Sequence, residues 1–297
     1  MGASFLRLLI AGAPGLMVTG ECAAHAVRAA PADPSHVEAV LAGLLVASSL
    51  LYARGVIRLW RKAGVGRAIR IVDVIRFALG TLALVTALLS PLDALAGRSF
   101  AMHMIEHELL MVVAAPLLVL ARPLEAWAWG LPRRTGHRLT AWAHGPAMAR
   151  LWHTLTAPVP GTIVHALALW LWHIPVLFAA ALASEALHVV QHVCFFASAL
   201  AFWWAMFGGT GRVARPISVA ALFATMLHTS ALGALLTFAP SAWYAHGAAP
   251  PFGLTTLEDQ QLGGLLMWVP GGLAYLAAGL AIVASWLGAS RARSDYG

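Results

Sequence analysis

Two pairs of histidines with the same spacing are the residues of this chain best suited to chemistry. They are His103 and His107 in HMIEH, and His188 and His192 in HVVQH. Four residues make just over one turn of a helix, so the two imidazoles of each pair share one face if the segments are helical. Imidazole is a ligand for zinc, copper, iron and nickel. The spacing therefore predicts a metal site, provided that the two segments are neighbouring helices.

The composition indicates that these helices lie in a membrane. Of the 297 residues, 60% are hydrophobic and only 10% are charged, whereas charged residues make up about 25% of an average soluble domain. A soluble fold, a disordered chain and a fibrous protein are therefore excluded. The two cysteines cannot build a disulfide framework or a cysteine-rich metal site.

Seven apolar stretches are long enough to cross a bilayer. Inside lipid each must be a helix, because a helix satisfies its own backbone hydrogen bonds. The expected fold is all-α, a polytopic bundle of about seven transmembrane helices over residues 37–287. Residues 1–30 have the pattern of a signal peptide, with Arg7 before an apolar segment and small residues at a cleavage site. The expected spans are 37–57, 71–90, 100–121, 160–183, 186–207, 215–238 and 260–287.

The distribution of Lys and Arg predicts the orientation of the bundle. If the mature N-terminus is outside, fifteen of these residues fall in the cytoplasmic loops and in a cytoplasmic tail, 288–297, while only Arg28 and Arg98 fall outside. Basic residues mark cytoplasmic loops, so we predict N-out and C-in. The formal charge of +7 is then explained by the basic cytoplasmic loops. The lipid bilayer is an expected partner, and no nucleic acid is expected.

Under this topology the two histidine pairs lie at the same depth. The spans 100–121 and 186–207 both run from outside to inside, and each pair lies at the outer start of its span. At 1.5 Å per residue, all four imidazoles are within about 1–2 turns of the outer surface. Polar side chains in a membrane are costly and usually functional. We therefore expect the four histidines to converge on one metal site near the outer face.

Other polar residues in the spans have competing interpretations. His173 and His228 lie nearer the middle of the membrane, where a histidine can equally well be a hydrogen-bonded member of the bundle. Asp259 begins the last span at the outer face, where it could bind a metal or cap the helix. We expect Glu106 and Glu108 to point away from the histidine face, toward solvent.

Copper is the metal that the ligand types favour. The histidines lie near the thioethers of Met102 and Met104, which are soft donors that suit Cu(I) at the rim of a site, and the set requires no cysteine or carboxylate. A site at the outer face also suits a cell that handles copper outside the cytoplasm. Zinc is the alternative metal.

Two other functions compete with a copper site. His103-Met-Ile-Glu-His107 matches the HxxEH pattern of inverted zincins, so an intramembrane zinc hydrolase that uses Glu106 is the main alternative. Against it, Gln191 replaces the glutamate in the second pair. A di-haem cytochrome is disfavoured, because stacked haems need ligands about four turns apart on one helix, and only eight residues separate His165 from His173.

Six short motifs follow one another along residues 40–287. They are HMIEHELLM at 103–111, WLWHIP at 170–175, LHVVQH at 187–192, MLHT at 226–229, DQQLGG at 259–264 and MWVPGG at 267–272. In these motifs and their order the chain resembles the CtaG family of polytopic cytochrome c oxidase assembly factors, first associated with caa-type oxidases.

This resemblance implies about seven spans and a role in the maturation of haem–copper oxidase, with copper delivery as the expected contribution. It implies an assembly factor that is not an enzyme. Together with the predicted orientation, this indicates a multi-pass protein of the bacterial inner membrane whose metal site faces the periplasm. The implied partners are cytochrome c oxidase subunits and periplasmic copper chaperones. The functional positions that it implies are His103, His107, His173, His188, His192, His228 and Asp259.

Overall fold

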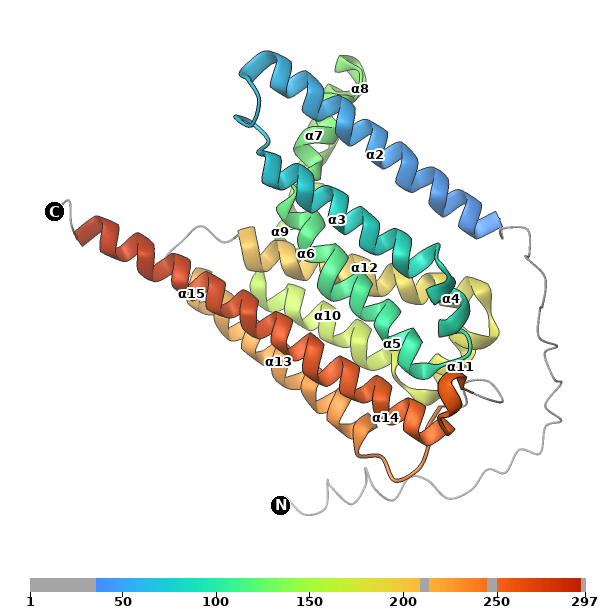
Figure 1. The fold of residues 1–297 in the computed structure, drawn as a ribbon. Helices are drawn as coiled ribbons and strands as arrows, with labels where there is room; N and C mark the ends of the chain where they lie inside the picture. Colours follow the sequence, from blue (N-terminus) through green and yellow to red (C-terminus); the bar gives the residue numbers. More distant parts are fainter. Residues whose placement is uncertain (1–35, 209–213, 245–249, 295–297) are drawn as a thin grey trace. The chain divides into compact units, whose positions relative to one another are not determined.

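The computed structural model describes residues 36–208, 214–244 and 250–294, and Figure 1 shows the path of the chain. No strand occurs in these ranges. Six helices are long and apolar enough to cross a membrane, and the number rises to seven if one bent pair counts as a span. The all-α polytopic bundle predicted from the sequence is therefore confirmed. The predicted signal peptide, residues 1–30, lies outside the described residues.

The six long spans follow the expected apolar stretches. Many of their large apolar side chains are exposed, Leu44 and Leu50 among them, which is the surface that lipid covers in a membrane protein. The last helix continues to Ser294, so that the described part of the predicted tail is helical. The spans are α2 (His36–Ala63), α3 (Ile71–Leu88), α5–η1–α6 (Phe100–Leu120), α12 (Glu185–Gly208), α13 (Ala214–Thr237) and α14–η3–α15 (Thr256–Ser294).

The stretch 160–183, which was expected to be one helix, is divided into two. α10 (Pro158–Trp172) has His173 as its C-cap, and a separate helix, α11 (Pro175–Ala183), begins two residues after it. The cause is Pro175, because a proline disfavours the helical conformation of the residue before it, and Ile174 has an extended backbone with ψ of 127°. At its other end α10 follows α9 (Pro146–Leu155) with a bend of 71°. His173 thus lies at a helix end.

Two spans contain a segment of π-helix. The first, η1, begins two residues after His107, and the second, η3, includes Pro270. Pro116 follows η1 closely, and a proline lacks the amide that would continue the α-helical hydrogen bonds. π segments are frequent at functional sites. The parts of these spans are α5 (Phe100–Glu108), η1 (Leu109–Ala114), α6 (Ala115–Leu120), α14 (Thr256–Leu266), η3 (Met267–Gly271) and α15 (Gly272–Ser294).

The histidine-bearing helices are embedded in the largest core cluster. α5 packs against α14 and against the short helix α4 (Pro91–Ala96), while α12 packs against α10, η1 and α6. α13 runs beside α15, as Figure 1 shows. The rings of Phe100, Phe178 and Phe195 are fully buried in this cluster. This packing brings the first turns of α5 and α12 next to each other.

The first span, α2, makes most of its contacts with α7 (Pro123–Gly130). Two glycines allow the backbones to touch, because a Cβ atom at Gly55 would overlap the carbonyl of Ala126, and one at Gly130 would overlap the carbonyl of Leu51. Small residues are a common means of close helix packing in membranes. The next helix, α8 (Arg133–Ala143), begins three residues after Gly130.

Candidate metal centre

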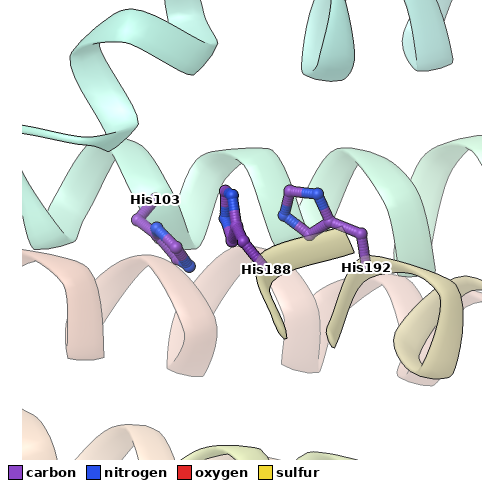
Figure 2. Close-up of side chains that lie close together, drawn as sticks. All are labelled: His103, His188 and His192. Carbon is purple, nitrogen blue, oxygen red and sulfur yellow. The ribbon is translucent and has the colours of Figure 1, made fainter. Parts of the chain in front are cut away.

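Three imidazoles from two helices come together near the first turns of α5 and α12 (Figure 2). Ring nitrogens of His103, His188 and His192, one from each, all lie within 4.8 Å of one another. We call these residues the histidine triad. The ring of His188 lies between the other two, with its centroid 5.2 Å from that of His103 and 4.2 Å from that of His192. Metal–imidazole bonds are about 2 Å long, so a small inward movement of the rings would bring all three nitrogens onto one ion.

His107 adjoins the triad without belonging to it. Its ring centroid is 4.3 Å from that of His103 and 5.3 Å from that of His192. On its other side the ring packs edge-on against Phe195 at 4.6 Å. The four histidines of the two pairs are thus brought together, three as a group that could share one ion and the fourth in contact with two of them.

Burial makes these imidazoles costly unless they gain a ligand. His103 and His107 are 1% and 2% exposed. In the described part of the chain, both ring nitrogens of His107 and the Nε2 atoms of His188 and His192 are buried without a hydrogen-bond partner. A buried polar group without a partner costs free energy. A metal ion bound to the triad would supply the missing partner for the rings of α12.

Glu106 lies beside the triad, which corrects the expectation that it faces solvent. Its carboxylate is fully buried, and Oε1 is 3.5 Å from Nε2 of His192. Three residues rotate a helix by about 300°, so positions 103 and 106 are on adjacent faces, and α12 covers both. The wrong prediction treated the side of α5 next to His103 as open to water. The structure instead places a carboxylate against the histidines.

Gln191 is a second buried polar residue next to the triad. It was not expected to be a site residue. It lies on α12 between His188 and His192 and is fully buried. Within the described residues, neither its amide oxygen nor its amide nitrogen has a hydrogen-bond partner. Its spacing of three residues from His188 was the available signal. A side-chain amide without a partner is, like the free imidazole nitrogens, a group that a bound ligand could satisfy.

His173 forms a further layer behind His107. Their ring centroids are 6.4 Å apart. Nδ1 of His173 is 2.7 Å from the carbonyl oxygen of Leu169, and its own carbonyl accepts a hydrogen bond of 2.6 Å from the hydroxyl of Tyr244. Burial raises the pKa of Tyr244, so its hydroxyl keeps the proton that it donates. His173 is therefore anchored next to the site and is not part of the triad.

His228 and Asp259 have other partners. Trp170 donates its indole N–H to Nδ1 of His228, which lies on α13, at 3.4 Å.

Asp259 receives three hydrogen bonds at the start of α5: Oδ1 accepts from the hydroxyl of Ser99 and the amide of Ala101, and Oδ2 accepts from the amide of Phe100. A carboxylate at a helix N-terminus is stabilising. Asp259 thus caps the helix that carries His103, whereas the expectation was a cap on its own helix or a metal ligand.

The expected sulfur donor Met104 does not lie at the rim of the site. Its side chain is fully buried in the apolar core cluster. It packs near Gly263 of α14, where an added Cβ would lie 3.2 Å from Cγ of Met104. Methionine next to a histidine on a helix points about 100° away from it, which directs Met104 toward α14. Met104 therefore does not support the preference for copper.

Comparison with known proteins identifies one family. A family model described as cytochrome c oxidase caa3 assembly factor matches residues 50–289. The matched region includes both histidine pairs and all the helices around the triad. No curated protein and no solved structure matches the chain.

Proposed function

The chain belongs to the family of cytochrome c oxidase caa3 assembly factors, and from this premise we propose that it holds a copper ion on the histidine triad and delivers it to the oxidase during assembly. The observation that carries the proposal is the convergence of three imidazole nitrogens within 4.8 Å inside a membrane bundle. Haem–copper oxidases contain copper, so a factor that assembles one has a reason to hold that metal.

The ligand set supports a site that both binds and releases copper. Imidazole binds copper well, and three protein ligands leave room for a ligand from a partner to enter and take the ion away. The buried carboxylate of Glu106 beside His192 would offset part of the positive charge of the ion. A compensating charge is valuable where the surroundings are apolar.

The position along the helices supports exchange with the periplasm. His103 and His188 are each the fourth residue of their helix, α5 and α12, so each lies only about 4.5 Å from the helix start. Under the orientation predicted by the basic residues, these starts are at the outer face of the bacterial inner membrane. The proposed partners are oxidase subunits and a periplasmic protein that brings copper.

A zinc hydrolase remains the second candidate because of Glu106. In the HxxEH pattern the glutamate acts on a zinc-bound water, and here the carboxylate lies 3.5 Å from His192. A buried carboxylate next to three imidazoles could serve as such a base. This function would require zinc at the triad and a substrate that reaches the start of α5.

Metal titration of the purified full-length protein tests both functions. We expect one Cu(I) per chain, with zinc displaced at equal concentration, and loss of copper in His188→Ala/His192→Ala. The matched control is His144→Ala/His153→Ala, which removes two exposed imidazoles from α9 and the end of α8 and should bind copper as the wild type does. Stoichiometric zinc that copper does not displace, with a hydrolytic activity, would favour the hydrolase. No metal bound at all would overturn both.

A further inference from the structure

A cavity away from the histidine triad lies between α2, α7 and α8. Its volume is about 780 Å³, within the range of about 300–1,000 Å³ that is usual for ligand sites. Four of its side chains are Arg58 and Lys62 from α2, and Arg133 and His137 from α8. No acidic residue is among the described residues that line it. A cavity with this lining is suited to an anion.

The charges of this cavity are not all used by the fold. Arg58 donates through Nη1 to the carbonyls of Trp129, Gly130 and Leu131, so its charge is engaged with the C-terminus of α7. Lys62 lies with Nζ 5.0 Å above the ring of Trp129. In the part of the chain that the structure describes, neither Lys62 nor Arg133 forms a salt bridge. Two cations therefore face the cavity without a carboxylate.

The cavity lies where a membrane surface is expected. Lys62 is next to the last residue of α2, and thus at the end of a membrane span. Trp129 and Trp142 are 41% and 63% exposed, and tryptophan is enriched at the depth of lipid headgroups. The basic loops place this end of α2 on the cytoplasmic side. Anionic headgroups are abundant at that depth.

We propose that this cavity binds the phosphate of an anionic phospholipid of the inner leaflet, with Lys62 and Arg133 as its cationic partners. The planar guanidinium of Arg133 can donate two parallel hydrogen bonds to phosphate oxygens. The ammonium of Lys62 adds a second charge from the neighbouring helix. Basic pockets between membrane helices on the cytoplasmic side bind phospholipid headgroups by this chemistry. The lipid would join α2 to α8, and its binding does not depend on copper.

Native mass spectrometry of the full-length protein in neutral detergent tests the proposal. We expect phosphatidylglycerol to be retained more strongly than phosphatidylcholine, and its dissociation constant to rise about tenfold or more in Lys62→Gln/Arg133→Gln. Both side chains are exposed, so the variant should fold, and an unchanged unfolding temperature without lipid checks this. The matched control, Arg54→Gln/Arg150→Gln, removes two exposed charges outside the cavity and should retain the lipid as the wild type does.

Three outcomes would overturn the proposal. The first is equal retention of phosphatidylglycerol by the cavity variant and the wild type. The second is equal retention of phosphatidylcholine, which would indicate a surface without preference for charge. The third is competition by inorganic phosphate at micromolar concentration, which would assign the cavity to a soluble anion rather than to a lipid.

Discussion

Oδ1 of Asp259 accepts a hydrogen bond of 2.6 Å from the hydroxyl of Ser99, a residue 160 positions earlier in the chain. The bond joins the start of α14 to the start of α5. His103 lies one turn after Ser99, so this contact helps to fix the position of a triad histidine. Asp259 does so without touching the proposed metal.

Asp259→Ala should destabilise the protein and weaken copper binding together. The variant leaves the hydroxyl of Ser99 and the amides of Phe100 and Ala101 without their acceptor, at a cost of about 2–3 kcal/mol. Thermal unfolding in detergent and copper titration measure the two effects. Glu258→Ala is the control, because losing this exposed glutamate, which forms a capping box with Thr255 at the start of α14, should cost about 1 kcal/mol or less and leave copper binding intact. Equal behaviour of the two variants would contradict the role given to Asp259.

Single substitutions should separate the triad from its neighbour. We expect His188→Ala to lower the affinity for Cu(I) by about 100-fold or more, because a direct ligand is lost. His107→Ala should lower it by about tenfold, which is the smaller end of the loss that is usual for groups that support a ligand. Competition with a chromophoric Cu(I) chelator measures both. A larger loss in His107→Ala than in His188→Ala would assign the ion to a different set of histidines.

Glu106→Gln should weaken copper binding without preventing assembly of the bundle. Removing a unit charge about 5 Å from the ion costs about 100-fold or more in affinity at an effective dielectric constant of about 20. Glu185→Gln, an exposed carboxylate at the start of α12, is the control and should have little effect. If Glu106→Gln keeps its metal but loses a hydrolytic activity, the zinc hydrolase is the better assignment.

The close contact of α2 with α7 predicts a strong effect of one methyl group. Gly55→Ala should destabilise the protein by about 1–3 kcal/mol, because its Cβ would overlap the carbonyl of Ala126. Gly43→Ala lies on the same helix with nothing within 4 Å of an added Cβ and should be neutral or slightly stabilising. Unfolding in detergent compares them. An unaffected Gly55→Ala would show that α2 can move away from α7 without loss.

The predicted orientation can be tested with fusions at the C-terminus. A cytoplasmic reporter placed after residue 297 should be active and a periplasmic one inactive, because the basic loops hold that end inside. The reverse pattern would put the histidine triad at the cytoplasmic face. It would also remove the argument for copper exchange with the periplasm.

Sequence alone was enough for the features that depend on composition or on local spacing. Long apolar runs predict spans, and four-residue spacing predicts that His188 and His192 share a face. The features that were missed depend on which helix lies opposite. The burial of Glu106 requires α12 as a cover, and the cap formed by Asp259 requires the start of α5 nearby. His173 lies at a helix end because Pro175 disfavours the helical conformation of Ile174, an effect that the length of an apolar run does not predict.

The π segment η1 lies between α5 and α6, so it sets the direction in which the histidines of α5 point relative to α6. An α-helix turns by about 100° for each residue, and a π turn holds one residue more than an α turn. If the same residues 109–114 formed an uninterrupted α-helix, His103 and His107 would therefore turn by about 100° around the axis relative to Pro116, whereas deleting one of these residues would leave their direction nearly unchanged. Compared with an α-helix of the same length, the wide turn changes the direction of the imidazoles. The surface that α6 presents to α3 and α12 stays the same.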